Sequence, residues 1–302
     1  MRYGNRRTAA ARRDASTAWE PPFRLGFCTY NQPDFPDVAA TGARYIRTDD
    51  PNATKVAQIR AVGCEPIAIA RYTLGTITNQ ATADAWAAAK LAQWTSLPSP
   101  PTVIECLNEP WNASFSDFTT NYALYMQILN TFTRQAWALW PSVRILVCGD
   151  TGPTAGWLDA VLAADTQKLY ADPRIRPSVH VYCENRTPDN TSGQGQFNFG
   201  RYSLTYSKLR AFGHPNPKCW ITEFGWESNT AGSVAAGLTV TEQEQSDNVI
   251  RGLDLLRTSG IAEVGCVFGM MQGTTPAYNV KRTDNSKKPV VAALTSYAYG
   301  KL

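Results

Sequence analysis

The sequence predicts a single-domain (β/α)₈ barrel, the TIM-barrel fold. Eight short apolar runs bounded by turn residues follow one another along the chain, and helical patterns lie between several of them. Strands that alternate with helices form a parallel sheet, because each helix returns the chain to the start of the next strand. Eight such units in 302 residues match the usual barrel length of about 250 residues.

The predicted strands are rich in β-branched and apolar residues. In chain order they cover residues 23–30, 43–50, 64–70, 102–109, 143–150, 178–183, 218–224 and 263–270. The seven cysteines follow the same period of 35 to 47 residues, each in or beside one of these runs: Cys28, Cys64, Cys106, Cys148, Cys183, Cys219 and Cys266. This placement favours small buried residues in successive strands over a disulfide framework or a zinc site.

Two of the segments between strands carry clear helical signals. After the fourth strand, apolar residues from Phe118 to Ala136 recur every three or four positions, and Pro141 follows as a stop. Before the eighth strand, Thr241 opens a capping-box pattern and Gly260 is typical of a helix end. A doubly wound open sheet is the alternative, but residues 26–30 lack the glycine-rich loop that usually follows its first strand.

No linker-like composition divides residues 21–302, so we expect them to form one barrel, preceded by a basic leader over residues 1–20. Five arginines and one aspartate lie in the first fourteen residues, and the remainder holds 24 basic and 24 acidic residues. The neutral body indicates no nucleic-acid partner. We expect the leader to be a disordered arm, with an arm that binds nucleic acid or an anionic surface as the alternative.

The apolar runs are too short for a membrane protein, and none approaches the eighteen or so residues of a membrane span. The leader has no apolar run behind it, so it is not a secretory signal as it stands. We expect a monomer. Its location stays open between the cell interior and an extracellular or virion-associated site reached by another route.

The C-terminal ends of barrel strands meet at one mouth, so the polar residues found there are the candidates for chemistry. Strands two, four, six and seven supply Arg47, Asn108, Glu109, His180, Tyr182 and Glu223. Glu109 and Glu223 come from nearly opposite sides of the mouth and point at the same space. A glycosidase that works with two carboxylates needs this arrangement.

At these residues the sequence resembles the retaining glycoside hydrolases of clan A, barrel enzymes that include the family five cellulases and the family 39 xylosidases. Residues 105–110 read Glu-Cys-Leu-Asn-Glu-Pro and resemble the clan's E-x-x-N-E-P fourth strand. Residues 220–226 read Trp-Ile-Thr-Glu-Phe-Gly-Trp and resemble its seventh strand. The segments 241–245 and 288–294 resemble the helices that follow in many members.

The resemblance implies a double-displacement mechanism with Glu109 as acid/base and Glu223 as nucleophile, their carboxyl groups about 5–5.5 Å apart. Glu223 then has to stay ionised, while Glu109 has to hold a proton near neutral pH. Arg47 would favour the ionised nucleophile and Tyr182 would donate a hydrogen bond to it. For Arg47 the alternative is a structural ion pair with Glu105.

The remaining candidates would bind substrate. Asn108 would hold the sugar 2-hydroxyl, and His180 would line the same wall, with a core histidine as the alternative. Trp111 and Trp226 directly follow the two glutamates, and flat aromatic rings suit the apolar C–H faces of sugars. Trp157, after the fifth strand, is a further aromatic candidate. Strict strand alternation puts Trp220 on the face opposite Glu223, beneath the helices.

The chain departs from the family five cellulases in two places. Residues 70–72 lack the histidine that follows their third strand, and residues 267–272 lack the tryptophan that ends their eighth. The resemblance therefore predicts the type of reaction better than it predicts which sugar is cleaved. A carbohydrate-binding barrel without turnover and a transglycosylase are the alternatives to hydrolysis.

We expect no cofactor and no metal. The two histidines, His180 and His214, belong to different βα units and cannot build a multi-histidine site. The expected partner is an oligosaccharide or polysaccharide.

Overall fold

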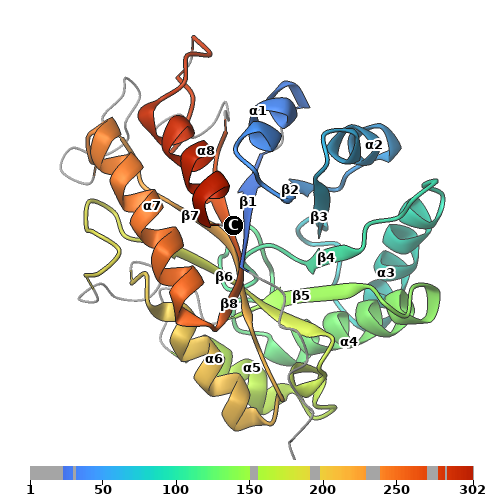
Figure 1. Cartoon of the computed structure of the whole chain (residues 1–302). Helices are drawn as coiled ribbons and strands as arrows, with labels where there is room; N and C mark the ends of the chain where they lie inside the picture. The colour runs from blue at the N-terminus through green and yellow to red at the C-terminus, as the bar shows by residue number, and fades with distance from the viewer. Residues whose placement is uncertain are drawn as a thin grey trace, which may run out of the picture.

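The computed structural model describes residues 23–29, 32–149, 156–190, 198–228, 239–270, 278–282 and 284–301. Within these residues eight parallel strands close into a barrel in which each strand pairs with the next and the eighth pairs with the first. Figure 1 shows the helices as an outer ring around the strands. The predicted (β/α)₈ barrel is confirmed, and the predicted leader over residues 1–20 lies outside the described residues.

All eight predicted strands are present, with some shifted ends. The structure gives β1 (Arg24–Cys28), β2 (Tyr45–Asp49), β3 (Glu65–Ala70), β4 (Val103–Cys106), β5 (Arg144–Cys148), β6 (Ile175–Tyr182), β7 (Cys219–Gly225) and β8 (Ala262–Phe268). The prediction carried the fourth strand on to residue 109. Strand β4 ends at Cys106 because Leu107 has a φ of 69° and leaves the extended conformation.

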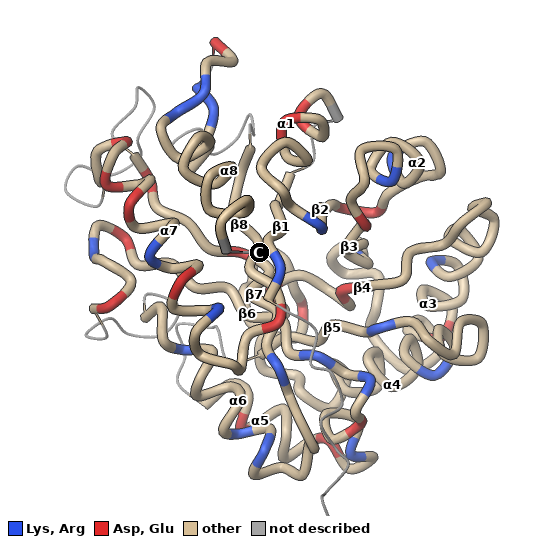
Figure 2. The backbone as a smooth tube through the Cα atoms, in the orientation of Figure 1, with Lys and Arg blue, Asp and Glu red and all other residues tan. Residues whose placement is uncertain are grey.

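The helices of the described residues cover the outside of the barrel. They are α1 (Phe35–Ala40), α2 (Ala53–Ala61), α3 (Gln80–Thr95), α4 (Tyr122–Leu139), α5 (Trp157–Ala164), α6 (Arg201–Phe212), α7 (Glu242–Ser259) and α8 (Pro289–Lys301), with short 3₁₀ turns at Gln32–Asp34 and Leu169–Ala171. In these helices hydrophobic stretches stay shorter than a bilayer crossing requires. Basic and acidic residues are interspersed over the ring (Figure 2).

The capping box predicted before α7 is formed. The Thr241 hydroxyl accepts a hydrogen bond from the Glu244 amide at 3.1 Å, and the Glu244 carboxylate accepts one from the Thr241 amide at 2.7 Å. Gly260, with a φ of 69°, ends the helix in the left-handed conformation as predicted.

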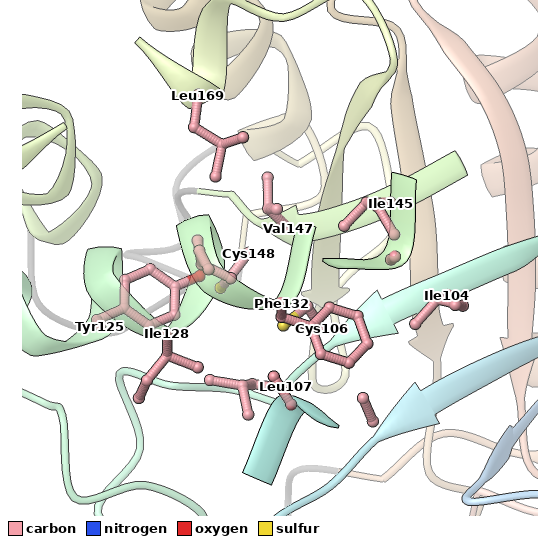
Figure 3. Packing of buried hydrophobic residues seen from close by; sticks show 14 of the residues in the cluster. Ile104, Cys106, Leu107, Tyr125, Ile128, Phe132, Ile145, Val147, Cys148 and Leu169 are labelled. Carbon is pink, nitrogen blue, oxygen red and sulfur yellow. The ribbon is translucent and has the colours of Figure 1, made fainter. Parts of the chain in front are cut away.

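An apolar shell lies between the strands and the helices. Figure 3 shows part of it, where Cys106 and Val147 of the strands meet Ile128 and Phe132 of α4. All seven cysteines are buried, as their positions in the predicted strands indicated. This shell fixes the strands and therefore the positions of the residues at their C-terminal ends.

The interior of the barrel is apolar at its N-terminal end and polar toward its mouth. The apolar layer consists of Tyr45, Ile67, Val103, Leu146, Trp220, Val264 and Cys266. Because side chains alternate along a strand, the next inward positions belong to the polar residues Arg47, Glu105 and Ser178. The polar layer thus rests on a packed apolar layer.

Trp220 lies inside the barrel, so the prediction that it packs beneath the helices is wrong. Strand β6 pairs Val179 with Ile221 but His180 with Glu223, which leaves Thr222 as an extra residue in β7. This bulge reverses the alternation, so Trp220 points inward below it while Ile221 packs outward against the helices. The sequence pattern has no signal for this bulge.

Gly26 of β1 makes room for the apolar interior layer. A Cβ there would lie 2.7 Å from Cys266 Sγ and 3.2 Å from Tyr45 Cβ.

We expect Gly26→Ala to lower the free energy of unfolding by about 1–3 kcal/mol through overpacking. Urea unfolding measures this, with Gly300→Ala, which meets open space, as the control. Adding Cys266→Ala should recover part of the loss, and purely additive effects would contradict the clash.

Candidate active site

Arg47 of β2 is the centre of the polar layer, and it is 0% exposed. Its Nε donates to the Glu105 carboxylate, its Nη1 donates to Glu223 Oε1 at 2.5 Å, and its Nη2 donates to Asn108 Oδ1 at 2.7 Å. A buried cation is stable only when it is paired and hydrogen-bonded. Arg47 therefore fixes three of the side chains that surround it.

Glu105 of β4 is the second buried charge of this layer. Burial opposes its ionisation, but the charges of Arg47 and His180 and the hydrogen bonds from both residues together hold the pKa of Glu105 far below its usual range. Its Oε1 also accepts a hydrogen bond from the Ser178 hydroxyl at 2.5 Å. Glu105 was predicted only as a possible ion-pair partner of Arg47, and Ser178 was not predicted for the site. Their inward positions on β4 and β6 are the signal that could have found both.

Glu223 of β7 is held at both carboxylate oxygens. Oε1 accepts from Arg47, and Oε2 accepts from the Tyr182 hydroxyl of β6 at 2.5 Å. The side chain is 9% exposed. A salt bridge to one oxygen and a hydroxyl hydrogen bond to the other fix the orientation of the carboxylate. The structure thus brings together Arg47, Tyr182 and Glu223, which the sequence placed on three different strands.

The backbone that carries Glu109 toward Glu223 and His180 has an unusual conformation. Leu107 and Glu109 have φ values of 69° and 42°, in the left-handed region that non-glycine residues rarely occupy. This turn buries Leu107 in the outer shell and directs Asn108 toward Arg47. Strain of this kind costs about 1–3 kcal/mol per residue and persists where the surroundings enforce it.

The Glu109 carboxylate has two partners of its own. Oε1 lies 2.9 Å from His180 Nδ1, and Oε2 accepts a hydrogen bond from the Asn112 amide at 2.9 Å. Glu109 is therefore held at both carboxylate oxygens. Asn112 was not among the residues predicted for the site.

His180 of β6 touches all three glutamates of the site. Its Nδ1 lies 3.6 Å from Glu223 and its Nε2 lies 3.8 Å from Glu105, in addition to the contact with Glu109. Burial lowers the pKa of an imidazole, but the charge of Glu223 and the hydrogen bonds to Glu105 and Glu109 raise the pKa of His180 to about 9. The imidazole is therefore protonated at neutral pH.

The proton that Glu109 was expected to hold lies on His180 instead. Burial works to raise the pKa of Glu109, but the hydrogen bond and the charge of His180 lower it below the usual value. The two groups form a hydrogen-bonded pair with one proton between them. Sequence reasoning could not foresee this, because the partner of Glu109 comes from a strand two units further along the barrel.

Glu109, His180 and Glu223 each have a donor atom within 4.8 Å of the other two. Among the described residues they form a group that could converge on a metal ion. A metal would have to displace the proton of His180 and its hydrogen bond to Glu109. The same closeness places an oxygen of Glu109 and an oxygen of Glu223 within reach of a single substrate atom.

Two tryptophans that were expected to contact sugar are buried. Trp226 is 1% exposed, its indole N–H donates to the Arg186 carbonyl at 2.7 Å, and its ring stacks on Phe199. Trp157 is 2% exposed and packs on Tyr125. Neither offers a free face, because both rings belong to the apolar shell. Trp111 differs, since it is half-buried and packs against that shell with only part of its surface.

Sequence comparisons identify no relative of this chain, since no protein-family model matches it and no curated protein matches it. Solved structures do resemble it. A family 39 glycoside hydrolase from the gut symbiont Bacteroides cellulosilyticus WH2 has a TM-score of 0.63 and 20% identity, over 92% of this chain and 64% of that one. The present chain thus spans less than two thirds of that enzyme.

Two GH128 proteins match almost end to end. A GH128 (subgroup II) endo-β-1,3-glucanase from Sorangium cellulosum has a TM-score of 0.61 and 16% identity, over 90% of this chain and 98% of that one. A GH128 (subgroup VII) oligosaccharide-binding protein from Trichoderma gamsii has a TM-score of 0.55 and 12% identity, over 92% and 94%. At these identities the likeness establishes the barrel fold of glycoside hydrolases and no more.

The proton on His180 links stability to pH. The folded pKa of about 9 lies above the ordinary value of 6.5, so the stabilisation is complete below pH 6.5 and is lost as the pH rises through 9. We expect urea unfolding to show a decline on the order of 2–3 kcal/mol across this window. In His180→Asn this part of the decline should disappear. Parallel stability curves for the two proteins would contradict the assignment.

Proposed function

We propose that this protein is a retaining glycoside hydrolase that cleaves β-linked glycans, with Glu223 as nucleophile and Glu109 as acid/base. The observation that supports this is the pair of glutamates with oxygens within 4.8 Å of each other and with different partners. Glu223 is bound by Arg47 and Tyr182, whereas Glu109 shares a proton with His180. This closeness is compatible with the retaining geometry, in which the two carboxyl groups lie about 5–5.5 Å apart.

In the first step Glu223 attacks the anomeric carbon and the glycosidic C–O bond breaks. Glu109 passes to the leaving oxygen the proton that it takes from His180, 2.9 Å away, so the pair ends the step without that proton. The covalent bond to the sugar removes the charge of Glu223, which is the strongest of the influences that raise the pKa of His180. Formation of the intermediate therefore makes the proton of His180 easier to release.

In the second step Glu109 accepts a proton from water, and the water oxygen attacks the anomeric carbon. The bond to Glu223 breaks and its carboxylate returns to Arg47 and Tyr182. Asn108, fixed by the Arg47 guanidinium at 2.7 Å, lies beside Glu109 in position to hold a sugar hydroxyl. A transglycosylase would share every step except that a sugar hydroxyl replaces the water, and product analysis distinguishes the two.

The second candidate function is glycan binding without turnover, since one of the similar structures is an oligosaccharide-binding protein. Two carboxylates with oxygens within 4.8 Å of each other repel, and a site that only binds sugar has no use for that repulsion. We therefore favour hydrolysis. The polymers to test first are β-1,3- and β-1,4-glucans, because similar structures include an endo-β-1,3-glucanase and an endo-β-1,4-glucanase.

Glu223→Gln tests the nucleophile. We expect it to lower release of reducing sugar from β-glucans, xylans, mannans and β-galactans by more than about 1,000-fold, because an amide cannot form the covalent intermediate. Glycan affinity, measured by calorimetry, should stay close to that of the wild type. Glycan binding by both proteins with release by neither would establish the binding function instead.

Glu109→Gln tests the acid/base. We expect a loss of about 100-fold or more on natural glycans and a much smaller loss in the first step on aryl glycosides, whose leaving groups need no proton. Burst kinetics with an aryl glycoside separate the two steps. An equal loss in the first step on both kinds of substrate would refute the acid/base role of Glu109.

A further inference from the structure

Three aromatic rings form a closed cluster directly above Glu223. Tyr182, Phe268 and Tyr278 make up this three-ring cluster, with centroids 5.4 Å apart for Tyr182 and Tyr278, 5.5 Å for Phe268 and Tyr278, and 6.0 Å for Tyr182 and Phe268. Each pair meets edge to face. Tyr182 also donates its hydroxyl to Glu223. The cluster is therefore in direct contact with the proposed nucleophile.

The Tyr278 ring lies where the inner wall of β7 would otherwise carry a side chain. Above the bulge, positions 223, 225 and 227 share the inward face of this segment. Position 225 is glycine, and a Cβ there would lie 3.4 Å from Tyr278 Cδ1 and 3.6 Å from Phe268 Cβ. The ring from the loop after β8 thus covers Gly225, between Glu223 below and Glu227 above.

Tyr278 and Glu227 are hydrogen-bonded to each other and half-buried. Burial and the charges of Glu227, Glu184 and Glu223 raise the pKa of Tyr278, so its hydroxyl stays neutral and can donate. An aromatic face beside a hydroxyl and a carboxylate offers stacking to the C–H face of a sugar and hydrogen bonds to its hydroxyls.

The segment that carries Tyr278 is held on several sides. The Gln245 side-chain amide of α7 donates to the Trp226 carbonyl at 2.7 Å and to the Tyr278 carbonyl at 3.3 Å. The amides of Val280 and Lys281 donate to Gly269 and Met270, both at 3.1 Å. This anchoring fixes the ring in position before any ligand arrives.

Lys281 and Arg282 anchor the same segment by charge. The Lys281 ammonium lies 3.0 Å from Asp34 and 2.8 Å from Asp37, and Arg282 pairs with Glu242 at the start of α7. Tyr278 is therefore tied to both the β1 and the β7 sides of the mouth.

We infer that Tyr278 and Glu227 form a sugar-binding wall next to the nucleophile, and that this wall selects a neutral sugar ring over a uronic acid. The inference rests on the proposed function, because it places the bound sugar beside Glu223. A carboxylate on that sugar would lie close to Glu223 and Glu227, which repel it. The nearby Glu184 is paired with Arg186 at 2.5 Å.

Matched substrates and variants test the wall. The probes are laminarihexaose and cellohexaose, and the same two oligosaccharides after oxidation of their primary alcohols to carboxylates. The variants are Tyr278→Phe, which keeps the ring, Tyr278→Ala, which removes it, Glu227→Gln, and the double variant Tyr278→Phe/Glu227→Gln. Tyr299→Ala is the control, because Tyr299 is 86% exposed on α8. Thermal unfolding shows that each variant is folded.

We expect Tyr278→Ala to lower kcat/KM on the neutral probe about 100-fold, and Tyr278→Phe and Glu227→Gln to lower it about tenfold each. The double variant should lose little more than either single one, because the hydroxyl and the carboxylate act as a pair. Glu227→Gln should also reduce the preference for neutral over oxidised probe about tenfold. A merely structural Glu227 would leave that preference unchanged.

The outcomes separate this inference from the proposed function. If the wild type cleaves a neutral probe and Tyr278→Ala and Glu227→Gln match it in both rate and preference, the wall is refuted while the hydrolase stands. If the wild type binds the neutral probes without cleaving them, turnover of these two glucans is refuted, and weaker binding by Tyr278→Ala still supports the wall. If the wild type prefers an oxidised probe to its neutral counterpart, the wall is refuted, while the hydrolase is judged by release of reducing sugar from the polymer panel.

Discussion

One buried cation determines how the interior of this barrel can be built. Arg47 has no access to solvent, so its charge has to be balanced inside the protein. Glu105 and Glu223 supply the balance from β4 and β7, and Asn108 accepts a further hydrogen bond. The charge of a third carboxylate, Glu109, is balanced by His180, which is protonated at neutral pH because its pKa is raised to about 9. The positions of these carboxylates thus follow from the need to neutralise charge in a low-dielectric interior.

Irregular backbone conformations bring additional side chains into this charged layer. The bulge at Thr222 lets two successive residues of β7 point inward, so Thr222 reaches Ser178 while Glu223 reaches Arg47. The left-handed conformation of Glu109 brings its carboxylate over the end of β4. Bulges and left-handed residues cost stability and concentrate at functional sites. Asp50 and Glu184, at the ends of β2 and β6, also have positive φ values, so the irregular backbone gathers at the mouth.

The two sides of the mouth differ in character. On the side of β2 and β3, ion pairs prevail, with Asp49 bound to Arg71 at 2.5 Å and Asp50 bound to Lys90 at 2.7 Å. On the side of β7 and β8, aromatic rings prevail, with Phe268 and Tyr278 packed around Tyr182. Apolar ring faces suit the C–H surfaces of sugars, and charged pairs suit their hydroxyls. The proposed glycan would therefore meet ion pairs on one side of the mouth and aromatic rings on the other.

The sequence by itself determined the order of strands and helices, because the hydrophobic period, the caps and the stops are local. It also identified Arg47, Glu109 and Glu223, because the C-terminal ends of parallel strands meet wherever a barrel closes. Only the tertiary structure decided that Trp220 faces the barrel interior, since the bulge in β7 inverts the alternation on which the prediction for Trp220 depended. Only the structure placed Tyr278 against Tyr182 and His180 against Glu109. Both depend on contacts between residues far apart in the chain, and such contacts leave no periodic signal in a sequence.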